Sequence, residues 1–103
     1  MKALIIGYGS IGMRHAEILL DMGVDVSVFS RRNIDYKNSY NSLSSALNED
    51  KFDYIVVCSK TSEHYSDLIE LKKLGYTKSI LVEKPLFEKP YNYNNNNNNI
   101  FVG

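Results

Sequence analysis

The sequence has little cysteine, no excess of either charge and no long apolar run, and each shortage excludes a class of protein. The single cysteine, Cys58, cannot form an internal disulfide, and no Cys/His spacing suggests a zinc or other metal site. Twelve basic residues balance twelve acidic ones, so no overall field attracts nucleic acid or an anionic membrane. No stretch approaches the roughly 18 apolar residues of a membrane span, and the opening apolar run is too short for a signal peptide. These shortages predict a soluble cytoplasmic protein.

What the chain does contain is an alternation of short apolar, β-rich runs with helical patterns. Its 103 residues allow one domain with a real core. The alternation predicts βαβ units and an α/β fold, a Rossmann-like doubly wound parallel sheet of five to six strands in three α/β/α layers. The expected strands cover residues 2–6, 24–29, 36–40, 53–59, 78–85 and, at the chain end, 100–103.

Helices are expected over residues 10–22, 42–50 and 62–74. In the first, apolar residues and one histidine recur at spacings of three and four: Ile11, His15, Ile18, Leu19 and Met22. Ser42 is placed to cap the second helix. Gly23 and Gly75 follow the first and third helices, where a glycine commonly ends a helix.

The pattern changes after residue 86. Residues 88–99 contain a run of asparagines from Asn94 to Asn99 and show no apolar period. Asparagine forms helices poorly because its side chain competes for backbone hydrogen bonds, so an Asn-rich low-complexity loop is expected here. We therefore divide the chain into a domain over 1–87, this loop, and the start of a sixth strand over 100–103.

The stretch "GYGSIG", residues 7–12, lies where the first strand passes into the first helix. Alone it is a weak signal, but in this position each glycine has a role in dinucleotide binding. Gly7 makes a tight turn, Gly9 lets the backbone approach a pyrophosphate, and Gly12 lets the helix pack closely on the strand. The helix N-terminus then offers N–H groups to the phosphates. A glycine turn without a ligand remains the alternative.

The end of the second strand indicates which dinucleotide would bind. An NAD site usually has a carboxylate there for the adenosine ribose, whereas this chain has Ser30, Arg31 and Arg32, and Asp35 lies too far along. A guanidinium can pair with the 2′-phosphate of NADP(H), which a carboxylate would repel. NADP(H) is therefore favoured, with NAD(H) and a merely solvated loop as the alternatives.

Four segments together resemble the N-terminal half of the Gfo/Idh/MocA family, named after glucose-fructose oxidoreductase and inositol dehydrogenase. They are "GYGSIGMRHAEIL", "SRR", "DYIVVCSKTSEH" and "ILVEKPL". The resemblance implies a Rossmann domain that binds NAD(P)(H). It also implies hydride transfer between the nicotinamide and a sugar, cyclitol or sugar nucleotide.

The resemblance also implies roles for single residues. It makes Gly7, Gly9, Ser10 and Ile11 pyrophosphate contacts, and Ser30 with Arg31 contacts of the adenosine ribose or 2′-phosphate. Ser59 falls beside the nicotinamide ribose, where Lys60 departs from the family's Thr-Pro pair.

Three more residues match family positions. His64 matches a histidine that opens the next helix, although packing or capping is the alternative for it. Glu83 and Lys84 match a Glu-Lys-Pro element whose lysine reaches the nicotinamide and the reacting hydroxyl, so Lys84 is the candidate catalytic residue. A plain surface lysine is the alternative there.

Members of this family carry a second domain that supplies the substrate pocket, and we expect this chain to lack it. The first hypothesis is therefore the NADP(H)-binding domain of an oxidoreductase, incomplete as a catalyst, which meets a carbohydrate-like substrate only with a second domain. The alternative is a non-enzymatic dinucleotide-binding or regulatory module. Self-association into a homo-oligomer is compatible with both.

Overall fold

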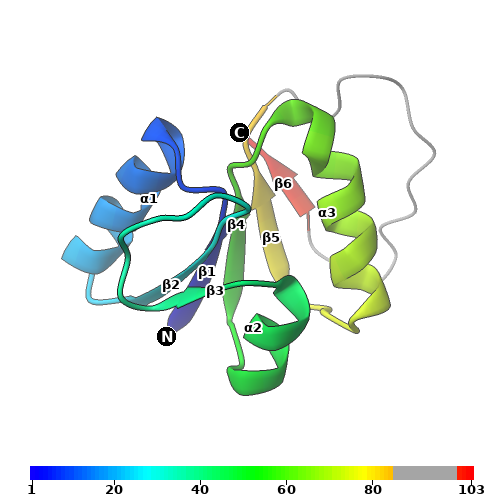
Figure 1. Ribbon diagram of the computed structural model, residues 1–103, viewed down its shortest axis with the longest axis horizontal. Helices are drawn as coiled ribbons and strands as arrows, with labels where there is room; N and C mark the ends of the chain where they lie inside the picture. Colours follow the sequence, from blue (N-terminus) through cyan, green and yellow to red (C-terminus); the bar gives the residue numbers. More distant parts are fainter. Residues whose placement is uncertain (85–99) are drawn as a thin grey trace.

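The structure is a computed structural model, and it describes residues 1–84 and 100–103. One six-stranded parallel sheet forms its centre, with the strand order β3-β2-β1-β4-β5-β6 (Figure 1). The strands are β1 (Lys2–Ile6), β2 (Asp25–Phe29), β3 (Ser39–Tyr40), β4 (Tyr54–Val57), β5 (Ser79–Val82) and β6 (Ile100–Val102). The order reverses direction between β1 and β4, as in a doubly wound fold, so the predicted fold class is confirmed.

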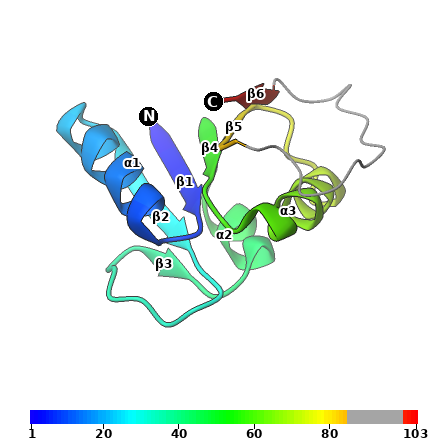
Figure 2. The same cartoon turned by 90° about the horizontal axis from the view of Figure 1, so that it is seen from above.

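Helices cover both faces of this sheet. They are α1 (Ser10–Asp21), α2 (Leu43–Glu49) and α3 (Thr61–Lys73). α1 lies on one face, whereas α2 and α3 lie on the other (Figure 2). Right-handed crossovers explain this arrangement. The connection from β1 to β2 adds a strand toward one edge of the sheet, whereas the connections from β3 to β4 and from β4 to β5 run toward the other edge.

The core has two parts, one on each face of the sheet. In β4, Ile55 and Val57 face α2 and α3, while Val56 faces α1, and all three are fully buried. A strand covered on both faces needs a continuous apolar run, which is what this segment has. Each such side chain contributes about 1.5–3 kcal/mol by leaving water.

Local signals at the helix ends also agree with the structure. The Ser42 side chain accepts a hydrogen bond from the Ser45 amide at 3.1 Å and so caps α2 as expected. Gly23 and Gly75 have φ angles of +81° and +85°, the left-handed conformation in which glycine follows a helix.

The face of α1 that packs on the sheet differs from the one its large apolar residues suggest. Ile11, Ile18 and Met22 are 52%, 51% and 71% exposed, whereas Gly12 and Ala16 are buried. The first turn of the helix approaches the strand so closely that only small residues fit between them. The apolar spacing therefore identified the helix but not its buried face.

The predicted asparagine-rich loop lies outside the described residues, as do Pro85 and Pro90. In the part of the chain that is described, no helix is long and apolar enough to cross a membrane.

Candidate functional site

The candidate site lies at the carboxyl edge of the sheet, where four strands end side by side. Ile6 is in register with Phe29 of β2 and Val57 of β4, and Val57 is in register with Val82 of β5. The residues after these strands, among them Gly7 and Ser30, therefore gather at the point where the strand order reverses. Open α/β sheets bind their ligands in this place.

The glycine turn is built from close contacts between backbone atoms. Gly7 has a φ of +93°, and a Cβ atom on it would lie 2.6 Å from the Ser59 amide nitrogen. A Cβ atom on Gly12 would collide with the Gly7 carbonyl oxygen. At Gly9 a Cβ atom would meet only the Arg32 guanidinium, at 3.9 Å. Gly7 and Gly12 are thus required by the fold, whereas the space in front of Gly9 is open.

This open space belongs to a cleft of about 460 Å³. The cleft is lined by Gly7, Tyr8, Gly9, Ser30, Arg31, Arg32, Cys58, Ser59, Lys60 and Glu63. Gly9 is also the N-cap of α1, whose first turn, with Ser10, Ile11 and Gly12, carries no acidic residue. The N–H groups and the positive end of this helix therefore meet no carboxylate of their own turn, which suits a pyrophosphate.

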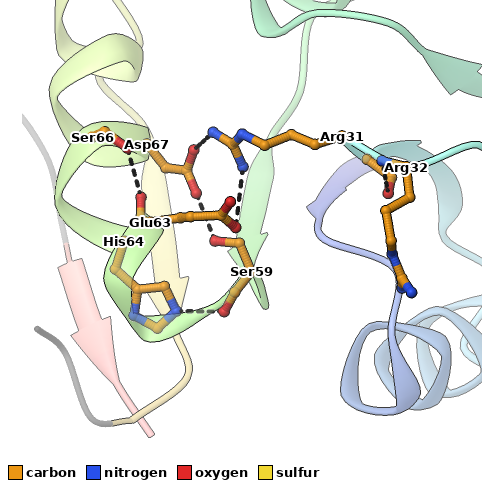
Figure 3. A network of polar contacts seen from close by, with 8 residues as sticks. Arg31, Arg32, Ser59, Glu63, His64, Ser66 and Asp67 are labelled. Carbon is orange, nitrogen blue, oxygen red and sulfur yellow. Dashed lines mark hydrogen bonds and ion pairs between the residues drawn. The ribbon is translucent and has the colours of Figure 1, made fainter. Parts of the chain in front are cut away.

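Arg31 crosses from the end of β2 to α3 (Figure 3). Its guanidinium binds Asp67 through Nη2 and lies 3.6 Å from Glu63 through Nη1. The pKa of Arg31 is raised: partial burial acts to lower it, but the hydrogen bond and attraction of Asp67, with attraction from Glu63 and Glu70, outweigh that effect. Arg31 thus already has carboxylate partners.

Arg32 extends in another direction, toward the turn before α1 (Figure 3). Its Nη2 donates to the Tyr8 carbonyl oxygen at 3.4 Å, and its amide donates to Ser30 Oγ at 3.2 Å. Among residues 1–84 and 100–103, no carboxylate forms an ion pair with Arg32. Its charge faces the glycine turn and the cleft.

Ser59 and His64 support the floor of the cleft. The Ser59 hydroxyl donates to Asp67 Oδ2 at 2.6 Å, and His64 Nε2 donates to the Ser59 carbonyl oxygen at 2.8 Å. Ser59 lines the cleft, but His64 is 1% exposed and lies beneath it. His64 can therefore influence a ligand through the loop that it fixes.

Glu83 and Lys84 follow β5 at the same edge. Glu83 Oε2 lies 2.7 Å from Nε2 of His15 on α1, which joins this strand end to the glycine helix. Lys84 is exposed, and its amide donates to the Gly103 carbonyl oxygen at 3.3 Å. The structure thus brings two of the three glycines, both arginines, Ser30 and Ser59 into one cleft, and it leaves Lys84 at an adjoining strand end.

Cys58 lines the cleft but does not have the properties of a nucleophile. Burial, with a smaller contribution from the charge of Glu83, raises the pKa of its thiol to about 12. The thiol therefore stays protonated near neutral pH.

Asp67 is a site residue that the sequence interpretation missed. It is fully buried on α3 and binds both Arg31 and Ser59. The sequence did contain a signal for a buried Asp67. This residue lies four positions before Leu71 and next to Leu68, on the apolar side of the helix. A carboxylate in that position has to have partners in the folded protein.

A family model described as "Oxidoreductase family, NAD-binding Rossmann fold" matches residues 1–95. The chain belongs to the Gfo/Idh/MocA family. This match confirms the resemblance carried by the glycine turn and the strand ends, and it shows that the chain contains an NAD-binding Rossmann domain. A comparison with curated protein sequences returned no match.

Solved structures agree on the fold. A probable dehydrogenase from Thermotoga maritima has a TM-score of 0.69 and 24% identity over 84% of this chain and 29% of its own. Myo-inositol 2-dehydrogenase from Lactobacillus plantarum has a TM-score of 0.70 and 23% identity over 86% of this chain and 29% of its own. RSP, a Rex-family repressor also solved with β-NADH, has a TM-score of 0.77 and 14% identity over 99% of this chain and 52% of its own. The chain thus spans less than a third of the two dehydrogenases.

Proposed function

We propose that this chain is the NADP(H)-binding domain of an oxidoreductase that transfers a hydride between the nicotinamide and a sugar, cyclitol or sugar nucleotide. The observation that carries the proposal is the open cleft in front of Gly9, at the N-terminus of α1, with a basic segment at its other wall. Family membership supports dinucleotide binding. The substrate class is taken from the family and from relatives such as the inositol dehydrogenase.

In this proposal different residues bind different parts of the cofactor. Backbone N–H groups of the turn and of the first turn of α1, at Gly9, Ser10 and Ile11, hold the pyrophosphate. The segment from Ser30 to Arg32 holds the adenosine ribose and its 2′-phosphate.

The residues after β4 and β5 are assigned to the nicotinamide end of the cofactor. Ser59 lies beside the nicotinamide ribose, and His64 fixes the Ser59 carbonyl. Glu83 orients this end through its contact with His15.

Lys84 is the proposed catalytic residue. It would bind the reacting hydroxyl and favour loss of its proton as the bound nicotinamide accepts the hydride. The exposure of Lys84 at the strand end is compatible with that role.

Calorimetric titration with NADPH and NADH tests the proposal. We expect NADPH to bind at least about tenfold more tightly, because one charge-assisted hydrogen bond to the 2′-phosphate is worth about 1.4 kcal/mol or more. Equal or tighter binding of NADH would contradict the NADP preference, and binding of neither would contradict the function itself.

A dinucleotide-sensing module is the second candidate. It is favoured by the similarity to RSP, which covers 99% of this chain. A sensor has to distinguish the reduced from the oxidised dinucleotide, so a large difference in affinity between NADH and NAD⁺, without turnover of sugars or cyclitols, would support this candidate instead.

A further inference from the structure

Arg31 is held by two carboxylates and one aromatic ring. Its guanidinium binds Asp67, lies 3.6 Å from Glu63, and stands 5.3 Å from the centre of the Phe29 ring. Two acidic groups against one cation leave no net positive charge at this point of the cleft. A phosphate approaching Arg31 would meet both carboxylates.

Asp67 cannot release Arg31 without a replacement. Its carboxylate is 0% exposed, and in the described residues it binds the Arg31 guanidinium and accepts a hydrogen bond from the Ser59 hydroxyl at 2.6 Å. Leaving a buried carboxylate without its cation is strongly destabilising, by more than one phosphate contact returns. The pair is therefore expected to persist when a ligand binds.

Arg32 differs from Arg31 in its partners. Both side chains are exposed, but that of Arg32 lies over the glycine turn, where its one side-chain hydrogen bond in the described residues is to the Tyr8 carbonyl at 3.4 Å. A long contact to a neutral acceptor is easily exchanged for a charged phosphate oxygen. Ser30, which accepts from the Arg32 amide, lies beside it.

We propose that the two arginines have separate functions: Asp67 holds Arg31 as a clamp between β2 and α3, and this leaves Arg32 as the side chain that binds the 2′-phosphate. Asp67 is then a positioning residue that sets cofactor selectivity without touching the cofactor. The proposal rests on the proposed NADP(H) function and assigns its phosphate contact to one side chain.

The test compares 2′,5′-ADP with 5′-AMP, because the two probes differ only in the 2′-phosphate. Arg32→Ala should lower the ratio of their affinities about tenfold, in line with one lost charge-assisted contact. Lys37→Ala is the matched control, since Lys37 is exposed and lines a separate hollow with Lys2 and Asp25, the first residues of β1 and β2. That control removes the same charge and should leave the ratio unchanged.

Arg31 is tested in a form that still folds. The double variant Arg31→Gln with Asp67→Asn removes both charges of the clamp, so that no buried carboxylate is left alone. It should keep the preference for 2′,5′-ADP. Loss of the preference in this variant, with the preference intact in Arg32→Ala, would make Arg31 the phosphate residue and overturn the proposal.

Asp67→Asn alone gives a readout that a merely structural role would not change. Neutralising Asp67 frees the charge of Arg31, so the ratio should rise, by about threefold, even as the melting temperature falls. An unchanged ratio would remove Asp67 from cofactor selectivity.

The wild-type titration separates failure of this inference from failure of the function. If 5′-AMP and 2′,5′-ADP bind equally, no residue recognises the 2′-phosphate and the inference is wrong, while dinucleotide binding stands. If the protein binds neither these probes nor NADPH and NADH, the proposed function is itself wrong.

Discussion

The two ends of the cleft are formed by different parts of the residues, backbone atoms at one end and long side chains at the other. The glycine turn at one end consists of backbone atoms whose positions depend on the absence of side chains at Gly7 and Gly12. The other end consists of long side chains, Arg31 and Arg32, whose directions depend on charged partners. One end is therefore fixed by sterics and tolerates no added atom at Gly7 or Gly12, whereas the other is fixed by charge balance and can be altered in steps.

The largest effect is expected at the glycine turn. Gly7→Ala should lower the free energy of unfolding by about 3 kcal/mol, because a left-handed φ and a collision with the Ser59 backbone add together. The measurement is urea unfolding. Gly75→Ala is the control, since Gly75 has a similar φ of +85° with nothing within 4 Å of its Cβ position, and it should cost only about 1 kcal/mol. Equal losses would show that contact with Ser59 does not limit the turn.

A smaller loss of stability is expected at Ser59, which donates a hydrogen bond to the Asp67 partner of Arg31. Ser59→Ala removes one donor from the buried Asp67 carboxylate and should lower the free energy of unfolding by about 2 kcal/mol. Ser66→Ala removes an exposed hydroxyl on α3 and should change it by less than about 0.5 kcal/mol. If both variants unfold alike, the Ser59 hydroxyl does not stabilise Asp67.

Gly9→Ala separates folding from binding within the glycine turn. Gly9 has a φ of −88°, which any residue adopts, and its Cβ position is open, so stability should change by less than about 1 kcal/mol. Affinity for NADPH and NADH should fall about tenfold or more, because the new methyl group occupies the space for the pyrophosphate. Unchanged affinity for both cofactors would place the pyrophosphate elsewhere.

The last prediction concerns the reactivity of the Cys58 thiol, with no change in stability or affinity. With the pKa of Cys58 at about 12, the fraction of thiolate at pH 8 is very small, so alkylation by iodoacetamide should be far slower than for a free cysteine. Because the thiolate is the reactive form, the rate should keep rising as the pH increases above 9. A rate plateau near pH 8 would contradict the raised pKa.

The sequence was sufficient for the fold and for the glycine turn because both depend on local patterns. Apolar runs mark the strands, and "GYGSIG" carries its constraints within six residues. The pairing of Arg31 with Asp67 was not predictable, because it joins residues 36 positions apart and depends on how α3 packs on the sheet. The close approach of α1 at Gly12 was expected from the glycine motif, whereas the burial of Ala16, which follows from that closeness, was missed.

The clamp between β2 and α3 has a consequence for engineering this protein. In a dinucleotide-binding fold, the residues after the second strand meet the adenosine ribose and so influence cofactor preference. Here position 31 is tied to position 67, so a carboxylate introduced at 31 would face Asp67 and Glu63 across the cleft and repel both. A redesign of the adenosine end has to treat positions 31, 63 and 67 as one unit, and position 32 is the place where a single substitution can act alone.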